Sequence, residues 1–555
     1  MFIHGGTSPD CDLSPTVAGE EDQNPLLLEL FMTESFCHDP HTGKQGGEVR
    51  IESSLNKNEE EFVARRRNSV LQSLKKLQIK CMVCVFQNEV PNIALLGSGG
   101  GQRAMVGLLG SLVQLQKTSS LLDCVLYLSG VSGSTWCMAS LYQEPDWSTK
   151  LEAVKDKILQ RLSGPGVSWT DALAKLKKYY YGKDFFSMTD IWAVMVVTAY
   201  VKEIDEHTLT EQWSQQSKDP LPIYTVIDKQ GKQLNEGDPW FEITPHEAGY
   251  SLTGAFVDAS NFGSQFHKGS KKNKQDEFDM LYLQEQQQLK ALCTSTLADE
   301  DDIKKQILQK IKEQDKRRQE GLRREKGTGS GKDFAAGLNL GPPEALLHNI
   351  SERSQPDPNS PATDQCYQEL MKIVDMNLSV STALDESIRT TLTDEAVHST
   401  LSESETRDFE DAGILLNAPY FSVLRKERNI DLIISLDFSE SDPFMTVKDT
   451  AKTCREQNIP FPEVNFASED SQKPKDFYVF KGQNTPTVIH IPLFNVVNCG
   501  DKIEDWRKKY RTFQGPYSAD MITDLMEVAG KNISNNKAKV LKEIRTIIGQ
   551  KRSRH

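Results

Sequence analysis

The chain has 555 residues and a formal net charge of −14, from 65 Lys and Arg against 79 Asp and Glu. An acidic balance of this kind excludes a general nucleic-acid binder, whose surface would carry a basic footprint. Apolar residues make up 37% of the chain, and the length suits either several domains or one large domain with insertions.

Residues 1–57 are predicted to form an acidic, disordered tail. Residues 1–60 hold twelve acidic and three basic side chains, with Gly, Ser and Pro interspersed and little apolar periodicity. Such a segment cannot bury enough apolar surface to fold by itself. A helix is predicted to begin near Asn58, because apolar residues from Phe62 to Leu77 recur at helical spacing.

Strands then alternate with helices. Residues 92–96 form a predicted strand, 97–101 a glycine turn and 104–115 a helix. Residues 122–128 form a second predicted strand, followed by a turn rich in Gly and Ser and a helix from Thr135. This alternation predicts an α/β fold with parallel neighbouring strands.

Residues 268–405 are predicted to be a charged insertion, partly helical and partly disordered. Within this range, residues 304–326 hold ten basic and four acidic side chains, a local charge of +6. Residues 385–411 return to acidity, with nine acidic and two basic side chains.

Order is predicted to resume near Phe409. Two apolar runs, 432–436 and 488–491, have the length and composition of buried strands. Residues 519–548 keep a helical apolar period and predict a closing helix or helix pair.

Two glycine-rich turns, each between a predicted strand and helix, carry the strongest chemical signal. The first, Gly97 to Arg103, exposes backbone N–H groups at a helix N-terminus, where negative charge is favoured. The second reads Gly-Val-Ser-Gly-Ser, with Ser132 on a tight strand-to-helix turn, as in a nucleophile elbow. Ser134 replaces the last glycine of the Gly-x-Ser-x-Gly pattern, and it is small enough for the bend.

Two other interpretations of these turns stay open. Gly99-x-Gly101-x-x-Ala104 matches a relaxed dinucleotide-binding fingerprint. Asp123 lies at the expected distance for a ribose-binding acid, but it precedes the second strand instead of ending it. The turns would also suit a structure in which glycines only permit close packing.

A nucleophilic serine needs a base. His490 lies C-terminal to every plausible acid, as in α/β-hydrolases, although a strand interior suits a mobile imidazole poorly. Asp411, in the sequence Asp-Ala-Gly just after order resumes, is the other candidate. A carboxylate can act as the base directly if it lies within hydrogen-bond reach of the hydroxyl and is partly desolvated.

These residues resemble the cytosolic (group IV) phospholipase A2 family. The resemblance is carried by residues 92–147, with the three-glycine turn and Leu-Ser-Gly-Val-Ser-Gly-Ser-Thr-Trp, and by similar stretches at 185–192, 240–249, 255–269, 411–444 and 461–506. The resemblance covers about two-thirds of the chain, and within the family the chain is most similar to the gamma type. It implies a patatin-like α/β lipase fold, with a central, mostly parallel sheet and a nucleophile elbow, in a catalytic domain over residues 58–555 that lacks a C2 domain.

The resemblance also implies a Ser-Asp dyad. Ser132 would attack the ester carbonyl, forming an acyl-serine intermediate, and Asp411 would take its proton and later activate water. The N–H groups of Gly100 and Gly101 would form the oxyanion hole, and Arg103 would bind the substrate phosphate. We therefore expect a phospholipase A2 and lysophospholipase acting on fatty-acyl esters of glycerophospholipids, independent of calcium and with no metal or other cofactor.

One departure from the family pattern supports an alternative. Residues 270–405 contain no Trp, whereas the family usually has Trp-containing segments there that help to build the lipid pocket and its cover. The alternative is a catalytically impaired paralogue that binds lipid or membrane surfaces as a structural protein.

Sequence patterns also bear on the cellular compartment. The longest nearly uncharged apolar run, 191–201, is shorter than the ~20 residues of a membrane span. We found neither a signal-peptide pattern nor a prenylatable Cys four residues from the end. Ten scattered cysteines fit a reducing compartment, and Cys81-x-x-Cys84 is interpreted as two packing thiols.

We therefore expect a cytoplasmic protein that associates peripherally with phospholipid membranes and does not bind nucleic acid. Docking would use exposed apolar side chains together with basic patches such as 304–326, each Lys or Arg near anionic lipid contributing ~1 kcal/mol. A solvated charged helix is the alternative interpretation of that run.

Overall fold

The computed structural model describes residues 49–77, 89–117, 121–182, 190, 193–228, 238–267, 270–273, 275–285, 387–388, 407–512 and 515–553. These residues belong to one structural unit that spans Gly47–His555. Most of the predicted acidic tail, the Cys81–Cys84 pair and the basic run 304–326 lie outside the described residues.

A twelve-stranded sheet has the order β1-β7-β6-β5-β4-β3-β2-β12-β14-β13, with β11 beside β4 and β10 beside β11. Its strands are β1 (Arg50–Ile51), β2 (Ile93–Gly97), β3 (Tyr127–Gly130), β4 (Leu221–Asp228), β5 (Trp240–Ile243), β6 (Glu247–Tyr250), β7 (Ala255–Asp258), β10 (Ser387–Ile388), β11 (Arg407–Asp411), β12 (Leu432–Asp437), β13 (Tyr478–Phe480) and β14 (Thr487–Pro492). A separate hairpin consists of β8 (Gln265–His267) and β9 (Ser270–Asn273).

The centre of the sheet is parallel. Strands β4, β3, β2, β12 and β14 all run in one direction, whereas the outer pairs and the β11–β4 pair are antiparallel. The sequences of β2 and β12 are mostly apolar and buried throughout, as expected for parallel strands covered on both faces. The predicted α/β fold with parallel neighbouring strands is confirmed.

One predicted strand is shorter than expected. Residues Leu121–Cys124 form a 3₁₀ turn, in which Val125 N donates to Leu122 O at 3.1 Å, and β3 begins only at Tyr127. The apolar run 122–128 therefore divides between a buried turn and a buried strand, because both environments favour the same residue types.

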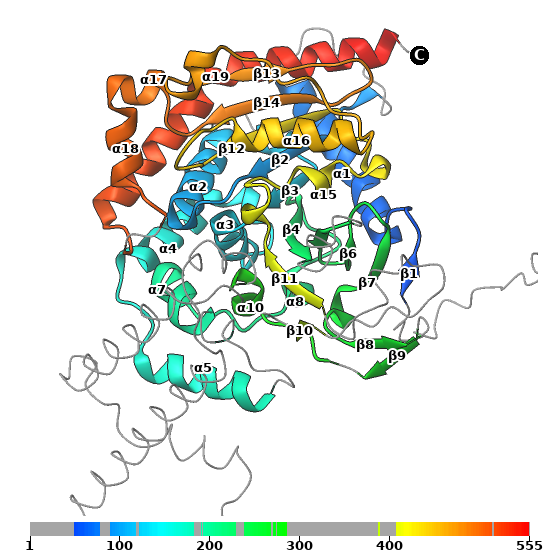
Figure 1. Ribbon diagram of the computed structural model, residues 1–555, viewed down its shortest axis with the longest axis vertical. Helices are drawn as coiled ribbons and strands as arrows, with labels where there is room; N and C mark the ends of the chain where they lie inside the picture. Colours follow the sequence, from blue (N-terminus) through cyan, green and yellow to red (C-terminus); the bar gives the residue numbers. More distant parts are fainter. Residues whose placement is uncertain are drawn as a thin grey trace, which may run out of the picture. The chain divides into compact units, whose positions relative to one another are not determined.

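The helices connect and cover these strands (Figure 1). They are α1 (Lys57–Lys76), α2 (Gly101–Lys117), α3 (Gly133–Tyr142), α4 (Leu151–Ser163), α5 (Trp169–Gly182), α7 (Thr198–Val201), α8 (Leu209–Gln212), α10 (Met280–Glu285), α15 (Tyr420–Val423), α16 (Met445–Glu456), α17 (Val496–Cys499), α18 (Ile503–Lys509) and α19 (Ala519–Ser553), with a π-helical turn at Ala193–Val197. The predicted closing segment is one helix, α19, which packs against α2. None of the helices in the described ranges has the length and apolarity that a membrane crossing requires.

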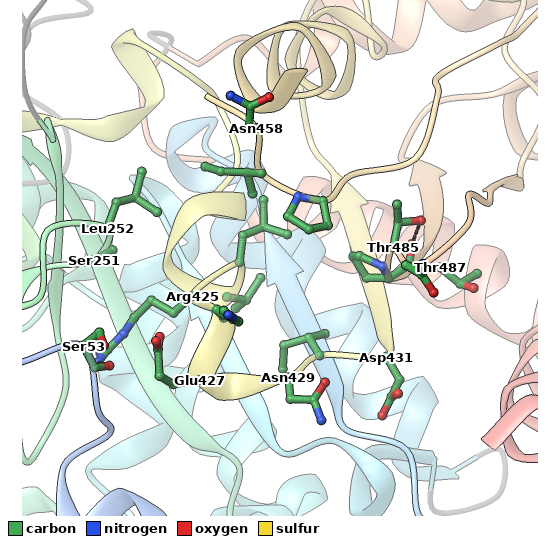
Figure 2. A pocket seen from close by; sticks show the side chains of 18 of the residues that line it. Ser53, Ser251, Leu252, Arg425, Glu427, Asn429, Asp431, Asn458, Thr485 and Thr487 are labelled. Atoms are coloured by element: carbon green, nitrogen blue, oxygen red, sulfur yellow. Dashed lines mark hydrogen bonds between the residues drawn. The ribbon is translucent and has the colours of Figure 1, made fainter. Parts of the chain in front are cut away.

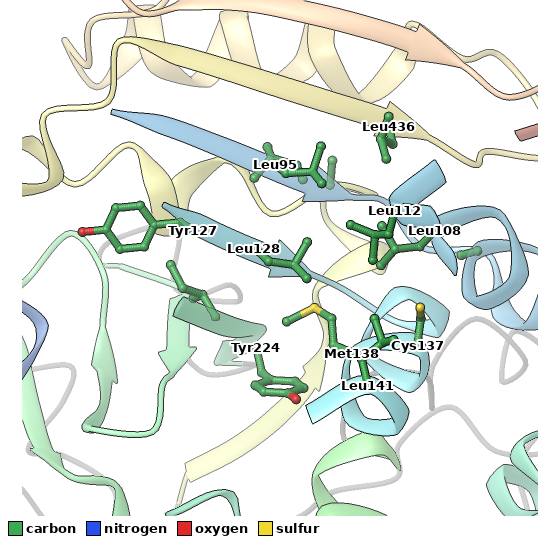
Figure 3. Packing of buried hydrophobic residues seen from close by; sticks show 14 of the residues in the cluster. Leu95, Leu108, Leu112, Tyr127, Leu128, Cys137, Met138, Leu141, Tyr224 and Leu436 are labelled. Carbon is green, nitrogen blue, oxygen red and sulfur yellow. The ribbon is translucent and has the colours of Figure 1, made fainter. Parts of the chain in front are cut away.

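The main core lies between the parallel strands and the two helices that follow the glycine turns. Figure 3 shows Leu95 of β2 and Leu128 of β3 packed with Leu108 of α2 and Met138 of α3, and all four side chains are fully buried. This packing fixes α2 and α3 against the carboxyl ends of β2 and β3, where both turns lie.

Helix α10 falls within the first residues of the predicted insertion. Its apolar side chains Met280 and Leu281 are buried, and Trp136 Nε1 on α3 donates to Gln284 O at 3.1 Å. Residues 280–284 therefore contribute to the packed core.

A buried ionic cluster joins the amino-terminal helix to the sheet. Arg428 Nε donates to Glu59 Oε1 of α1 at 2.8 Å, and its Nη2 donates to Glu242 Oε1 of β5 at 2.7 Å. Arg425 Nη1 also donates to Glu242 Oε1, at 2.7 Å. Since unpaired buried charges are very costly, this cluster specifies how α1 and the loop before β12 pack on the sheet.

Candidate active site

The two glycine turns lie side by side. Gly97 at the end of β2 pairs in register with Gly130 at the end of β3, so both turns leave the sheet at the same edge. A β-carbon added to Gly133 would lie 1.9 Å from Gly101 O. The backbones of the turns are thus in direct contact, and only glycine fits at position 133.

Ser132 occupies the bend between β3 and α3. Its φ of 52° and ψ of −134° place it at the N-cap of α3 in a backbone conformation that residues with a β-carbon rarely adopt. Ser134, the residue that departs from the elbow pattern, donates through Oγ to Ser98 O at 2.6 Å. The serine at this position therefore ties the elbow to the first glycine turn.

The first glycine turn lies against the Ser132 side chain. An added β-carbon on Gly99 would be 2.8 Å from Ser132 Cβ and 3.3 Å from Ser132 Oγ. Gly100 and Gly101 have φ values of 144° and 56°, and α2 begins at Gly101. A helix N-terminus at this point favours negative charge beside the serine.

Asp411 reaches the same place from the other direction. Strand β11 runs antiparallel to β4 and ends with Asp411 opposite Val226, whereas the parallel strand β3 ends with Gly130 opposite Tyr224. Two residues of β4, about 7 Å, therefore separate the two strand ends. Asp411 is buried, and its Oδ1 accepts a hydrogen bond from Gly413 N at 2.7 Å.

Asn417 lies between these groups and was missed in the sequence analysis. Its Oδ1 is 2.5 Å from the position of an added β-carbon on Gly99 and 3.1 Å from that on Gly413. Its Nδ2 donates to Gly99 O at 3.3 Å and to Ser439 Oγ at 3.0 Å. A single polar residue within the apolar segment after Asp411 was the only sequence signal for it.

Arg103 lies beside the glycine turn in a fully buried position. Its Nε donates to Phe438 O at 2.7 Å, its Nη1 to Tyr510 O at 2.6 Å and its Nη2 to Thr512 Oγ1 at 3.1 Å. Glu440 is a further partner, at 3.4 Å from Nη1. Desolvation by burial lowers the pKa of Arg103.

His490 lies away from the two turns. It sits within β14, and β12 and β2 separate that strand from β3, a lateral distance of about 14 Å. Its Nε2 is hydrogen-bonded to Pro443 O at 2.9 Å, and burial lowers the pKa of the imidazole to about 4. The structure does not bring His490 together with Ser132.

The position of Asp123 bears on the dinucleotide interpretation. Asp123 lies in the 3₁₀ turn before β3, at the amino end of that strand. The glycine turn lies at the opposite end of the neighbouring strand β2. Asp123 therefore does not meet the glycine turn as a ribose-binding acid would.

The cavity in Figure 2 lies at the other end of the parallel strands. It has a volume of about 640 Å³, and its lining includes Asp431 and Thr487, which stand at the amino ends of β12 and β14. Most of its labelled polar residues come from the loops before and between these strands, whereas Ser53 and Ser251 follow β1 and β6. This cavity is therefore separate from the space around Ser132.

Comparisons with known proteins identify the family of the chain. Residues 93–284 match a family model described as a lysophospholipase catalytic domain. The chain is 32% identical over 540 residues to cytosolic phospholipase A2 gamma of Homo sapiens, covering 90% of this chain and 97% of that protein. It is 30% identical over 575 residues to cytosolic phospholipase A2 gamma of Mus musculus, covering 89% and 92%.

A solved structure supports the same fold. Human GIVD cytosolic phospholipase A2 superposes with a TM-score of 0.68 at 22% identity, covering 90% of this chain and 68% of that chain. The predicted lipase fold is confirmed, as is the resemblance to the gamma type. The chain belongs to the cytosolic phospholipase A2 family.

Proposed function

We propose that the protein is a phospholipase A2 and lysophospholipase that uses Ser132 and Asp411 to hydrolyse fatty-acyl esters of glycerophospholipids. The observation that carries this proposal is the meeting of β3 and β11 on one edge of β4, which brings a strained serine and a buried carboxylate together. The names of the relatives favour the same substrate class.

The reaction would proceed in two halves. Ser132 Oγ attacks the ester carbonyl carbon while its proton passes to the Asp411 carboxylate. The bond to the glycerol oxygen then breaks, Asp411 returns the proton to that oxygen, and the lysophospholipid leaves. Asp411 next deprotonates a water, which attacks acyl-Ser132 and releases the fatty acid, and the proton returns to Ser132.

The negative charge that develops on the carbonyl oxygen of the substrate must be stabilised by hydrogen-bond donors. The N–H groups of Gly100 and Gly101 are suited to this role, because their turn lies against Ser132 and α2 begins there. Removal of one such donor typically costs ~3–4 kcal/mol of transition-state stabilisation.

Arg103 is our candidate for binding the substrate phosphate. Its Nη2 lies 2.8 Å from the position of an added β-carbon on Gly100, beside the proposed oxyanion hole. Glu440 and Thr512 occupy part of its donor set, so a phosphate would replace these partners. If Arg103 binds no phosphate, its role is to hold the segments after β12 and α18 around the first glycine turn.

No step of this reaction requires a metal ion, and we propose that activity is independent of calcium. The groups that move protons and stabilise charge are all supplied by the chain. Hydrolysis should therefore proceed at the same rate with added calcium and with a calcium chelator.

We expect one face of the protein to contact the membrane. Among the described residues, four large apolar side chains are exposed: Leu415, Met445, Val496 and Val497. They follow the carboxyl ends of β11, β12 and β14, the sheet edge at which Ser132 lies. We define these four residues as the apolar rim and propose that it contacts a phospholipid surface.

Charge in the segment after α17 is mixed. Lys502 and Lys508 are exposed there together with Asp501, Glu504 and Asp505, so the proposed contact rests on the apolar rim, and each basic side chain that reaches anionic lipid would add ~1 kcal/mol. The basic run 304–326, which was also predicted to bind lipid, lies outside the described residues.

One experiment distinguishes the enzyme from a catalytically impaired lipid-binding paralogue. Purified protein is treated with a fatty-alkyl fluorophosphonate and assayed for fatty-acid release from phosphatidylcholine and lysophosphatidylcholine vesicles. We expect labelling and hydrolysis by the wild type and by Ser534→Ala, an exposed serine on α19, and neither by Ser132→Ala. A wild type that is as inert as Ser132→Ala would overturn the proposed function.

A further inference from the structure

Asn417 is hydrogen-bonded to one particular peptide group, whose carbonyl also accepts a longer bond, 3.5 Å, from Ser98 Oγ. Its Nδ2 donates to Gly99 O, and that carbonyl belongs to the same planar peptide unit as the N–H of Gly100. In a trans peptide the C=O and N–H groups point in opposite directions. A hydrogen bond that holds Gly99 O therefore also fixes the direction of the Gly100 N–H.

This peptide unit needs an anchor. It lies between Gly99 and Gly100 in a run of three glycines, and Gly100 has a φ of 144°. Glycine permits backbone conformations that other residues exclude, so a free peptide unit here would have a low barrier to rotation. Gly99 N also donates a backbone hydrogen bond to Asn417 O, at 3.1 Å. Asn417 therefore binds both the N–H and the C=O group of Gly99.

Asn417 is itself held by a chain of hydrogen bonds that leads away from the site. Its second Nδ2 hydrogen is donated to Ser439 Oγ, which in turn donates to Asp437 Oδ1 at 2.7 Å. Ser439 N also donates to Asp437 Oδ2, at 3.3 Å. Both N–H bonds of the carboxamide are thereby used, so its orientation toward Gly99 O is specified by groups outside the site.

We propose that Asn417 is a positioning residue for the oxyanion hole, anchored by Ser439 and Asp437. It holds the Gly99–Gly100 peptide so that the Gly100 N–H faces the carbonyl oxygen of a substrate attacked by Ser132. The same carboxamide lies next to Gly413, whose N–H binds Asp411, so one side chain links the glycine turn to the loop of the base. This inference rests on the proposed function.

The test compares Asn417→Ala and Ser439→Ala with the wild type. Loss of the Asn417 side chain should lower kcat about 10²- to 10³-fold, as for the loss of one oxyanion-hole donor, with little change in KM. Ser439→Ala should have a smaller effect, about 10-fold. The double variant should be no slower than Asn417→Ala alone, because both substitutions release the same peptide group.

A second measurement separates positioning from a purely structural role. A fatty-alkyl trifluoromethyl ketone binds as an oxyanion adduct of the serine, whereas a non-hydrolysable ether phospholipid binds without one. We expect Asn417→Ala to weaken ketone binding about 100-fold and to leave ether-lipid binding and the melting temperature nearly unchanged. Equal losses for both ligands, or wild-type kcat in the variant, would overturn the inference. If the wild type itself neither hydrolyses nor binds the ketone covalently, it is the proposed function that fails.

Discussion

Gly130 and Asp411 contact the same edge of β4, Gly130 opposite Tyr224 and Asp411 opposite Val226. Parallel β3 and antiparallel β11 approach this edge from opposite directions, so their carboxyl ends face each other. The sheet itself therefore determines the spacing between the elbow of Ser132 and the carboxylate. Neither residue depends on a long loop for its position.

Asp411→Asn should reduce kcat about 10²- to 10⁴-fold, the usual contribution of a general base. The asparagine keeps the volume and can still accept the hydrogen bond from Gly413 N, but it cannot take the proton of Ser132. The measurement is fatty-acid release from phosphatidylcholine vesicles.

His490→Gln is the matched control for this prediction. The imidazole is buried and bound to Pro443 O, three strands away from β3, so the variant should keep near wild-type kcat once it is folded. An active Asp411→Asn together with an inactive, stably folded His490→Gln would restore a serine-histidine mechanism.

The parts of the site that could be predicted from the sequence are local. A glycine run or a Gly-x-Ser-Gly bend between an apolar strand and a helix specifies its own turn, because few residues adopt the required backbone. Asp411 was proposed as the base from Asp-Ala-Gly at the return of order and by resemblance, and the structure places it beside the serine turn.

The parts that were missed depend on distant pairing. Asn417 makes its two side-chain hydrogen bonds because β2 and β12 are neighbours, which brings Ser439 and Gly99 within reach of one carboxamide. The antiparallel addition of β11 to β4 is equally long-range. No apolar period or turn signal within either segment encodes such contacts.

Gly133→Ala should inactivate the protein. The added β-carbon would meet Gly101 O at 1.9 Å and Gly101 C at 2.5 Å, both backbone atoms that cannot turn away. The glycine turn must then move off the elbow, so we expect lower kcat and a lower melting temperature. Gly166→Ala is the control, since a β-carbon added to Gly166 meets nothing within 4 Å. The stability of this variant should differ from that of the wild type by less than ~1 kcal/mol. Wild-type activity in Gly133→Ala would contradict the close contact between the two turns.

Substitutions in the apolar rim should separate membrane binding from chemistry. Val497 and Met445 are 55% and 50% exposed, so burial of the exposed part in lipid is worth roughly half of the ~1.5–3 kcal/mol of a fully exposed side chain, and an aspartate at the same position must also be desolvated. Val497→Asp and Met445→Asp should therefore weaken sedimentation with phospholipid vesicles by at least about 10-fold. Hydrolysis of a water-soluble, monomeric short-chain ester should stay unchanged.

Asn429→Asp provides a charge-matched control for the apolar rim. Asn429 is exposed, lines the cavity at the amino ends of the strands and already has a positive φ that Asp tolerates. Its substitution should leave vesicle binding at the wild-type level. If Asn429→Asp and Val497→Asp weaken vesicle binding equally, the loss reflects net charge, and the apolar rim is not the membrane contact.

Asp437 should make stability depend on pH. Burial is the main cause that raises the pKa of this carboxyl from 3.8 to about 7, although Ser439 and the charges of Arg103 and Arg507 act in the opposite direction. Between pH 4 and pH 7 the Asp437 carboxyl binds a proton in the folded state but not in the unfolded state. The contribution of Asp437 to the free energy of unfolding therefore falls as pH rises.

Asp437→Asn removes this titration, while the amide oxygen of the asparagine still accepts a hydrogen bond from Ser439 Oγ. We therefore expect the variant to gain stability relative to the wild type from pH 4 to pH 7, with a constant difference above pH 8, in urea unfolding at each pH. A difference that is flat across this range, or that grows toward low pH, would show that Asp437 is ionised in the folded protein throughout.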